Sequence, residues 1–293
     1  MDLISIFKRF PDNEACMEHL EHVRWGDSPH CPHCDSLSVA RKADGDRVGR
    51  WNCHDCHASF NVLAGTIFSK TRIPLPKWFL GISLMLNAKK SLSSCQLARD
   101  LDLNQKSAWY MAMRIREAMT GERKLLAGIV EADECYVGGK PRKRNNRDDD
   151  QDAPAGRGTS KLPVIGAVER GGDVVAQPSP RVTGSTLAEF IGRVVDRTGS
   201  LLMTDQFPAY RPVGRTMPHA TVDHTVRYVD GQVHVNTIES FWALLKRAWY
   251  GQHHHYSRKH AAAYVVEACY KYNARHEADT FGAFIQGAVA AAA

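Results

Sequence analysis

The sequence has no apolar run long enough to cross a membrane. Its longest apolar stretch, from Trp78 to Leu86, is far shorter than the roughly 20 residues that a spanning helix needs. The first residues also lack the charged and then apolar layout of a signal peptide. We therefore expect a cytoplasmic protein with no membrane partner.

The chain as a whole has little net charge, but positive charge is concentrated in one segment. The formal net charge is only +6. Residues 70–124 contain eleven Lys or Arg and four acidic residues, so this segment alone has a net charge of +7 and the remainder is close to neutral. A basic block of this kind predicts binding to a polyanion, most simply nucleic acid.

The cysteines are too unevenly placed for a disulfide framework. Four of the eight are scattered, and the other four form two C-x2-C pairs, Cys31 with Cys34 and Cys53 with Cys56, separated by eighteen residues. Two such knuckles offer four thiolates to one ion, and tetrahedral sulfur ligation favours zinc. We predict one structural Zn²⁺ that has no open position for catalysis, with a helix over residues 13–24 packed on this ribbon.

Helical periodicity fills the basic block. A helix is expected from residue 75, and a second over 91–101 is followed by the short break 102–104 and a third helix over 105–119. This layout is that of a helix-turn-helix, whose second helix enters the DNA major groove. A plain helical hairpin between two domains is the alternative. The residues expected to face DNA are Gln105, Lys106, Ser107 and Trp109.

Strands and helices alternate in the second half of the chain. The expected strands are 129–133, 164–169, 173–178 and 200–204, and the expected helices are 186–197 and 237–249. Residues 138–161 contain almost nothing apolar and predict a mobile loop. Residues 288–293 are small and apolar without periodic support, so we expect a frayed end. The alternation indicates an α/β fold.

Three acidic residues lie in informative positions in this half. Asp133 and Asp205 each follow a mostly apolar run and are expected at the ends of short buried strands, whereas Glu239 lies early in an amphipathic helix that carries Lys246 two turns later. Adjacent strands are about 4.8 Å apart, so their carboxylates can share a metal. The pattern predicts a site that holds divalent cations for phosphoryl transfer. For each acid alone, an ordinary surface or capping role is the alternative.

Three stretches carry a resemblance to a known family. They are Glu-Ala-Asp-Glu-Cys-Tyr-Val-Gly-Gly-Lys at 131–140, Thr-Asp-Gln-Phe-Pro-Ala-Tyr at 204–210 and His-Val-Asn-Thr-Ile-Glu-Ser-Phe-Trp at 234–242. Together with the ribbon and the closing Tyr-Asn-Ala-Arg at 272–275, they resemble the DDE transposases of prokaryotic insertion sequences that carry an N-terminal zinc ribbon. The resemblance runs in the family's order over residues 13–280.

The resemblance implies an RNase H-like catalytic core with the first aspartate on the central strand, the second on a neighbouring strand and the last acid on a helix. It implies three domains: an N-terminal helix and zinc ribbon at 1–65, a helix-turn-helix-like segment at 70–125, and the RNase H-like domain at 126–285.

The resemblance also assigns catalytic roles, to Asp133, Asp205, Glu239 and Lys246, with the three acids as magnesium ligands and Lys246 on DNA phosphate. Family members use Asn or Glu at the third position, and this chain has both Asn236 and Glu239, three residues apart on one helix face. We choose Glu239 because a carboxylate neutralises metal charge better than an amide. Cys135 stands where the family commonly has Thr.

The implied function is Mg²⁺-dependent transposition. The enzyme would bind double-stranded DNA at terminal inverted repeats, cleave it, and transfer the freed 3′ end into target DNA. A homo-oligomer is expected when two ends are paired. Two alternatives stay open: a DNA-binding regulator with an inactive transposase core, and an RNase H-like nuclease selective for branched DNA.

Overall fold

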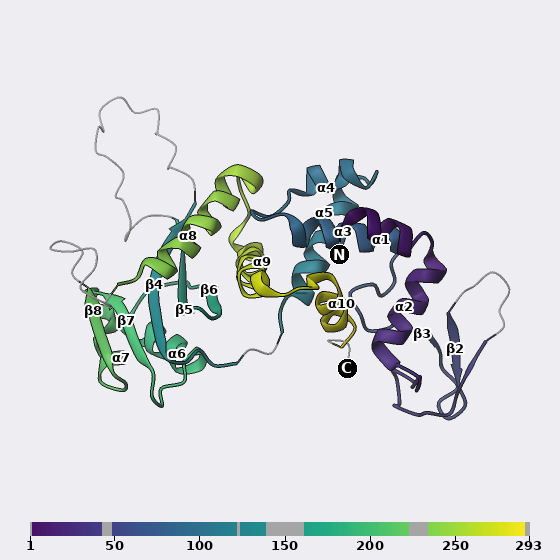
Figure 1. The fold of residues 1–293 in the computed structure, drawn as a ribbon, viewed down its shortest axis with the longest axis horizontal. Helices are drawn as coiled ribbons and strands as arrows, with labels where there is room; N and C mark the ends of the chain where they lie inside the picture. The colour runs from purple at the N-terminus through teal and green to yellow at the C-terminus, as the bar shows by residue number, and fades with distance from the viewer. Residues whose placement is uncertain (1, 43–48, 122–123, 139–160, 223–233, 291–293) are drawn as a thin grey trace. The chain divides into compact units, whose positions relative to one another are not determined.

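The computed structural model describes residues 2–42, 49–121, 124–138, 161–222 and 234–290 (Figure 1). These residues form two compact units, Met1–Gly121 together with His276–Ala293, and Glu122–Arg275. The loop predicted over residues 138–161 lies almost wholly outside the described residues. Within the described ranges, no helix has the length and apolar character needed to span a membrane.

The first unit begins with two helices and a small three-stranded sheet. The elements are α1 (Leu3–Arg9), α2 (Asn13–Trp25), β1 (Val39–Arg41), β2 (Arg50–Cys53) and β3 (Ser59–Asn61). The antiparallel order β1-β2-β3 brings the two cysteine knuckles together. Glu21 of α2 is buried and accepts a hydrogen bond from the Trp51 indole at 2.9 Å. Helix α2 therefore packs on the ribbon, as predicted.

Three helices follow in the basic block: α3 (Leu75–Asn87), α4 (Ser94–Asp100) and α5 (Gln105–Ala118). Side chains of Ser93 and Asn104 cap the last two by accepting backbone N–H bonds. The connection between α4 and α5, residues 101–104, is one residue longer than the predicted break because α4 ends at Asp100. Helix α4 also begins later than the predicted 91–101, because its cap is Ser93.

The C-terminal helix α10 (Thr280–Ala290) belongs to this first unit, whereas the sequence analysis assigned residues up to 285 to the RNase H-like domain. Its Phe281 ring packs against Phe79 of α3 at a centroid distance of 5.6 Å. Ala288 and Val289 are buried within the helix. The expectation of a frayed end was therefore wrong for residues 288–290, because α10 continues through them and the side chains of Ala288 and Val289 are buried.

The second unit is built on a five-stranded mixed sheet in the order β6-β5-β4-β7-β8. Strands β5 and β6 run antiparallel to their neighbours, and β4, β7 and β8 are parallel. Asp133 lies on the central strand β4 and Asp205 on the adjacent β7, which is the RNase H-like placement that the resemblance implied. The strands are β4 (Ile129–Val137), β5 (Leu162–Glu169), β6 (Val174–Pro178), β7 (Leu201–Asp205) and β8 (His219–Val222).

Two details of the strands differ from the prediction. Asp133 is in the middle of β4 and not at its end, because residues 134–137 continue to pair with residues 162–165 of β5. Asp205 does end its strand, as predicted. Strand β8 was not predicted, and its four residues pair with β7 at the edge of the sheet.

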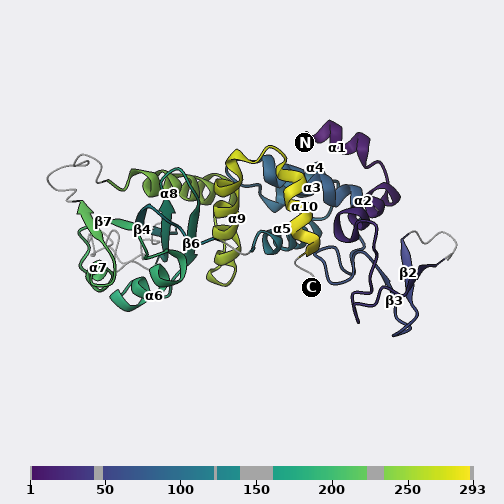
Figure 2. The same cartoon turned by 60° about the horizontal axis from the view of Figure 1, so that its bottom comes forward.

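Helices cover both faces of this sheet, with α6 (Gly184–Val194) on one side and α8 (Asn236–Ala248) on the other (Figures 1 and 2). Alternate residues of β4 divide between two cores: Val130 and Ala132 pack with the α6 side, and Cys135 and Val137 with α8 and α9. Asp133 therefore faces α8. The remaining helical segments are η1 (Pro208–Tyr210), α7 (Arg211–Gly214), η2 (Trp249–His253), η3 (Arg258–His260), α9 (Ala261–Asn273) and η4 (Ala274–His276).

Candidate metal centres and active site

The four ribbon cysteines form one cluster. Their Sγ atoms all lie within 4.8 Å of one another, and the Cys31–Cys56 and Cys34–Cys53 Sγ pairs are each 3.6 Å apart. A tetrahedron with Zn–S bonds of 2.3 Å has edges of about 3.8 Å, so the arrangement fits a zinc ion. No pair is joined in a disulfide. This cluster is the predicted structural zinc site.

The knuckle backbone favours thiolates at this cluster. The Cys56 backbone N–H donates to Cys53 Sγ at 3.5 Å, and the His33 N–H donates to Cys31 Sγ at 3.4 Å. The first of these bonds is the main cause that lowers the pKa of Cys53 to about 6, whereas the hydrogen bond with Cys56 is the main cause that raises the pKa of Cys34 to about 12. Hydrogen bonds to the charged sulfur stabilise the form that binds metal.

The predicted DNA-facing residues lie on the first turns of α5. Lys106 is exposed there. The Gln105 side-chain amide donates to the Ser94 hydroxyl of α4 at 3.1 Å, and the Ser107 backbone N–H donates to the Asn104 cap at 2.8 Å. Gln105 and Ser107 thus help to fix the junction of the two helices, and Lys106 extends outward from it.

Asp133 and Asp205 come from neighbouring parallel strands. The β4–β7 pairing matches Val130 with Leu202 and Glu131 with Met203. Continued for two residues, this register sets Asp133 level with Asp205, on the same face of the sheet. The Phe207 backbone N–H donates to Asp205 Oδ1 at 3.0 Å and so orients this carboxylate at the end of its strand.

A tryptophan of α8 binds Asp133 directly. The Trp242 indole N–H donates to Asp133 Oδ2 at 3.0 Å. The ring lies against Gly166, which is the β5 partner of Asp133, and a Cβ added at Gly166 would lie 2.5 Å from the ring. The absence of a side chain at Gly166 therefore makes room for the indole. No role was predicted for either residue, because their contact depends on strand register.

The surroundings of Asp133 disfavour its ionised form, and a bound cation would stabilise that form. Burial, and then the negative charges of Glu134 and Asp205, raise the pKa of Asp133 to about 7, although the Glu134 backbone N–H and the Trp242 indole oppose this rise. Carboxylate oxygens are the ligands that Mg²⁺ prefers in proteins. The donor set therefore fits a divalent metal.

The other two predicted residues lie along one stripe of α8. At about 100° per residue, Glu239 and Lys246 lie about 60° and 40° around the helix from Trp242, the residue that contacts Asp133, whereas Asn236 is about 120° away. Both Glu239 and Lys246 are exposed, and the positive charge of Lys246 acts on buried Cys135 of β4. The stripe thus faces the strand that carries Asp133.

The three acids do not form a closed metal cluster. Within the described ranges, the ribbon cysteines alone bring three or more candidate ligand atoms within 4.8 Å of one another. Asp133 and Asp205 are brought together by strand pairing, and Glu239 lies on the adjacent helix without an observed contact to either. Two-metal sites hold ions about 3.5–4 Å apart and so need a wider ligand set than one ion does.

Glu134 lies on the opposite face of β4 from Asp133, as its place next to Asp133 in a strand requires. Its carboxylate accepts a hydrogen bond from the buried Tyr210 hydroxyl at 3.4 Å, in the core on the α6 side. Burial, and then the charge of Glu134, raise the pKa of Tyr210 well above its ordinary value. Glu134 is therefore a structural acid.

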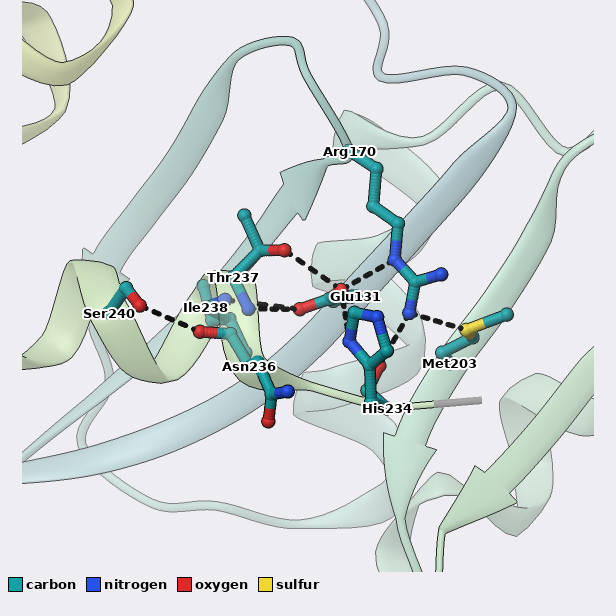
Figure 3. A network of polar contacts seen from close by, with 8 residues as sticks. All are labelled: Glu131, Arg170, Met203, His234, Asn236, Thr237, Ile238 and Ser240. Carbon is teal, nitrogen blue, oxygen red and sulfur yellow. Dashed lines mark hydrogen bonds and ion pairs between the residues drawn. The ribbon is translucent and has the colours of Figure 1, made fainter. Parts of the chain in front are cut away.

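One buried acid of this site was not singled out by the sequence analysis. Glu131 is fully buried, lies two residues before Asp133 on the same face, and contacts the first turn of α8 (Figure 3). The sequence does contain a signal for it: a charged residue in an otherwise apolar strand, in phase with Asp133.

The sequence matches two known domain families, one within each part of the chain described above. The family described as the ISXO2-like transposase domain matches residues 125–273, and the transposase zinc-ribbon domain matches residues 11–59. The chain belongs to the ISXO2-like transposases that carry this ribbon, and it is a DDE transposase of the insertion-sequence type.

A relative from Halobacterium salinarum agrees with this assignment. It is described as an uncharacterized protein in transposable element ISH50, and it is 32% identical over 271 residues, which cover 88% of this chain and 90% of the relative. Solved structures are far more distant. The Mos1 strand transfer complex is 13% identical over 72% of this chain and 75% of that chain, with a TM-score of 0.29, and a simian T-cell lymphotropic virus intasome is 14% identical over 56% and 57%, with a TM-score of 0.30.

Proposed function

We propose that this transposase cleaves DNA at the terminal inverted repeats of its element and transfers the freed ends in one active site, formed by Asp133, Asp205 and Glu239. The observation that carries the proposal is the contact from α8 to Asp133, at a strand position level with Asp205. This contact favours a third ligand on the side of α8 that carries Trp242. Around the helix axis, Glu239 lies closer to Trp242 than Asn236 does.

Divalent cations bound by these carboxylates would supply positive charge to both the attacking and the leaving oxygen of an in-line displacement. Because the pKa of Asp133 is raised to about 7, a proton competes with a metal ion for this carboxylate near neutral pH. In the first displacement, water attacks a phosphodiester at the element end and the P–O3′ bond breaks, which gives a 3′-OH and a 5′-phosphate. In the second, that 3′-OH attacks a phosphodiester of target DNA, a new P–O bond joins the two DNAs, and the target strand's own 3′ oxygen leaves as a free 3′-OH.

The remaining predicted residues hold DNA. Lys246, exposed two turns after Glu239, extends toward phosphate as a point charge. The ribbon and the α4–α5 pair recognise the element ends, with Lys106 on DNA at the start of α5. Pairing of two ends requires a homo-oligomer, and the cation at the catalytic acids is Mg²⁺ or Mn²⁺.

Isosteric variants of the three acids test the proposal. Asp133→Asn, Asp205→Asn and Glu239→Gln should each abolish Mg²⁺-dependent cleavage and strand transfer on a duplex that carries the element ends, and should leave end binding intact. Both reactions should fail together because one set of ligands serves both. The amide keeps the shape of the side chain, so circular dichroism should report an unchanged fold.

Asn236→Ala is the matched control for the third ligand. If Glu239→Gln retains cleavage and Asn236→Ala loses it, Asn236 takes the third place. Normal cleavage by all four variants would mean that the active site is elsewhere. Wild-type protein that binds ends without cutting them would indicate a regulator, and cleavage of branched DNA without repeats would indicate a structure-selective nuclease.

A further inference from the structure

Glu131 is held by donors from several elements of the second unit (Figure 3). Its carboxylate accepts four hydrogen bonds: from Arg170 Nε at 2.6 Å, from the Thr237 backbone N–H and hydroxyl at 2.8 and 3.0 Å, and from the Ile238 backbone N–H at 3.1 Å. His234 Nδ1 lies 3.3 Å from the same carboxylate without hydrogen-bond geometry. A carboxylate offers about four lone-pair sites, so Glu131 has none left for a metal ion.

Two of these bonds supply the N-cap that α8 lacks in its own sequence. The capping position of α8 is Val235, which has no side-chain oxygen and makes no capping bond. Glu131 instead accepts the N–H groups of Thr237 and Ile238, which have no partner within the helix. A negative charge at this end also interacts favourably with the helix dipole. Strand β4 therefore fixes the first turn of α8, the turn that carries Asn236 and Glu239.

Arg170 extends the same network to β7. Besides Glu131, its guanidinium donates to the His234 carbonyl at 2.9 Å and contacts Met203 Sδ at 3.2 Å. Met203 lies two residues before Asp205 on the same strand. Arg170 itself lies in the β5–β6 turn, which Arg275 holds by donating to the Gly172 carbonyl at 2.8 Å. One buried ion pair thus joins the three elements that carry the catalytic acids.

We propose that Glu131 is a positioning residue for the third metal ligand: by capping α8 from β4, it sets where the first turn of that helix presents its ligand beside Asp133 and Asp205. This inference rests on the proposed function. It applies equally whether Glu239 or Asn236 supplies the ligand, because both belong to the turn that Glu131 holds.

The test measures Mn²⁺ binding to the full-length, zinc-loaded protein by electron paramagnetic resonance, independently of DNA cleavage. Glu131→Gln should weaken Mn²⁺ binding by at least about tenfold, the usual effect of changing a residue that orients a metal ligand. Thr237→Val keeps the backbone N–H and removes the hydroxyl bond, so about a fivefold loss is expected. Ser240→Ala is the matched control. Its hydroxyl bonds the Asn236 carbonyl in the same turn and does not contact Glu131, so Mn²⁺ affinity should stay within about twofold.

The outcomes separate this inference from the proposed function. If Glu239→Gln or Asn236→Ala weakens Mn²⁺ binding but folded Glu131→Gln and Thr237→Val bind as the wild type does, Glu131 is only structural and the inference is overturned. If Asp133→Asn also binds as the wild type does, the proposed metal site itself fails. Glu131→Gln removes the negative charge that pairs with Arg170, and this loss can unfold the variant. In that case Thr237→Val, which keeps the ion pair, decides between the two outcomes.

Discussion

Replacing Asp133 by Asn should stabilise the metal-free protein at alkaline pH. Burial and neighbouring negative charges raise the pKa of Asp133 from 3.8 to about 7 in the folded protein. The folded state therefore retains a proton that the unfolded chain has already released between these two values. Stability falls as the pH rises through this window, because the unfolded state binds fewer protons there.

The size of the effect follows from the two pKa values. The difference between 3.8 and about 7 corresponds to roughly 4 kcal/mol, at about 1.36 kcal/mol per pKa unit. Asp133 is partly accessible to solvent, which screens its charge, so we expect a gain of about 1–3 kcal/mol for Asp133→Asn at pH 8. For a unit of this size, each kcal/mol moves the melting temperature by about 2–4 °C.

Scanning calorimetry in EDTA at several pH values from 4 to 8 measures this gain. The difference between variant and wild type should be small at pH 4 and should grow to its full value above pH 7. The matched control is Asp173→Asn, an exposed aspartate of the same unit, which should change stability by no more than about 0.5 kcal/mol at any pH.

Added Mg²⁺ should reverse the order of stability. The wild type gains free energy by mass action when it binds the ion, and Asp133→Asn, which lacks a ligand, should gain little. A variant that is no more stable than the wild type at pH 8 in EDTA would refute the electrostatic argument for Asp133.

Three further predictions concern the catalytic domain, the zinc ribbon and the contact of α5 with DNA. Gly166→Ala on β5 should lower stability by about 1–3 kcal/mol and reduce DNA cleavage, because the new Cβ would lie 2.5 Å from the Trp242 indole ring of α8. Gly251→Ala, where an added Cβ meets nothing within 4 Å, should do neither. Cys53→Ser should remove the single equivalent of zinc measured by metal analysis and abolish end binding with the RNase H-like core still folded, whereas Cys95→Ser, which lies outside the cluster, should retain the zinc. Lys106→Ala should lower the slope of DNA affinity against salt by about one unit, and an unchanged slope would exclude a phosphate contact.

The ribbon and the positions of two of the proposed catalytic acids were predictable because their signals are local. Two C-x2-C pairs bring four thiolates to one ion in almost any hairpin that joins them. Apolar runs before Asp133 and Asp205 predicted strands, and the structure has both strands in the expected neighbouring places. The helical spacing of the basic block likewise predicted α3, α4 and α5.

What the sequence did not reveal depends on register between distant segments. The length of β4 beyond Asp133 is set by its pairing with residues 162–165, across a long insertion. The roles of Gly166 and Trp242 arise only once β5 pairs with β4 and α8 crosses that point of the sheet. No local sequence pattern predicts such contacts, because the residues that make them are tens of positions apart in the chain.

Glu131 and Asp133 lie on one strand but have different surroundings, and these favour different roles. Both face α8 and both are acids in a mostly apolar strand. Glu131 receives four hydrogen bonds, one of them from a guanidinium, so its charge is neutralised within the protein. Asp133 receives an indole N–H from Trp242, and the negative charges of Glu134 and Asp205 raise its pKa. A buried carboxylate without a cationic partner favours either a proton or a metal ion. Asp133 is therefore the proposed ligand of the two, and Glu131, whose lone pairs are already used, is proposed to hold the helix in place.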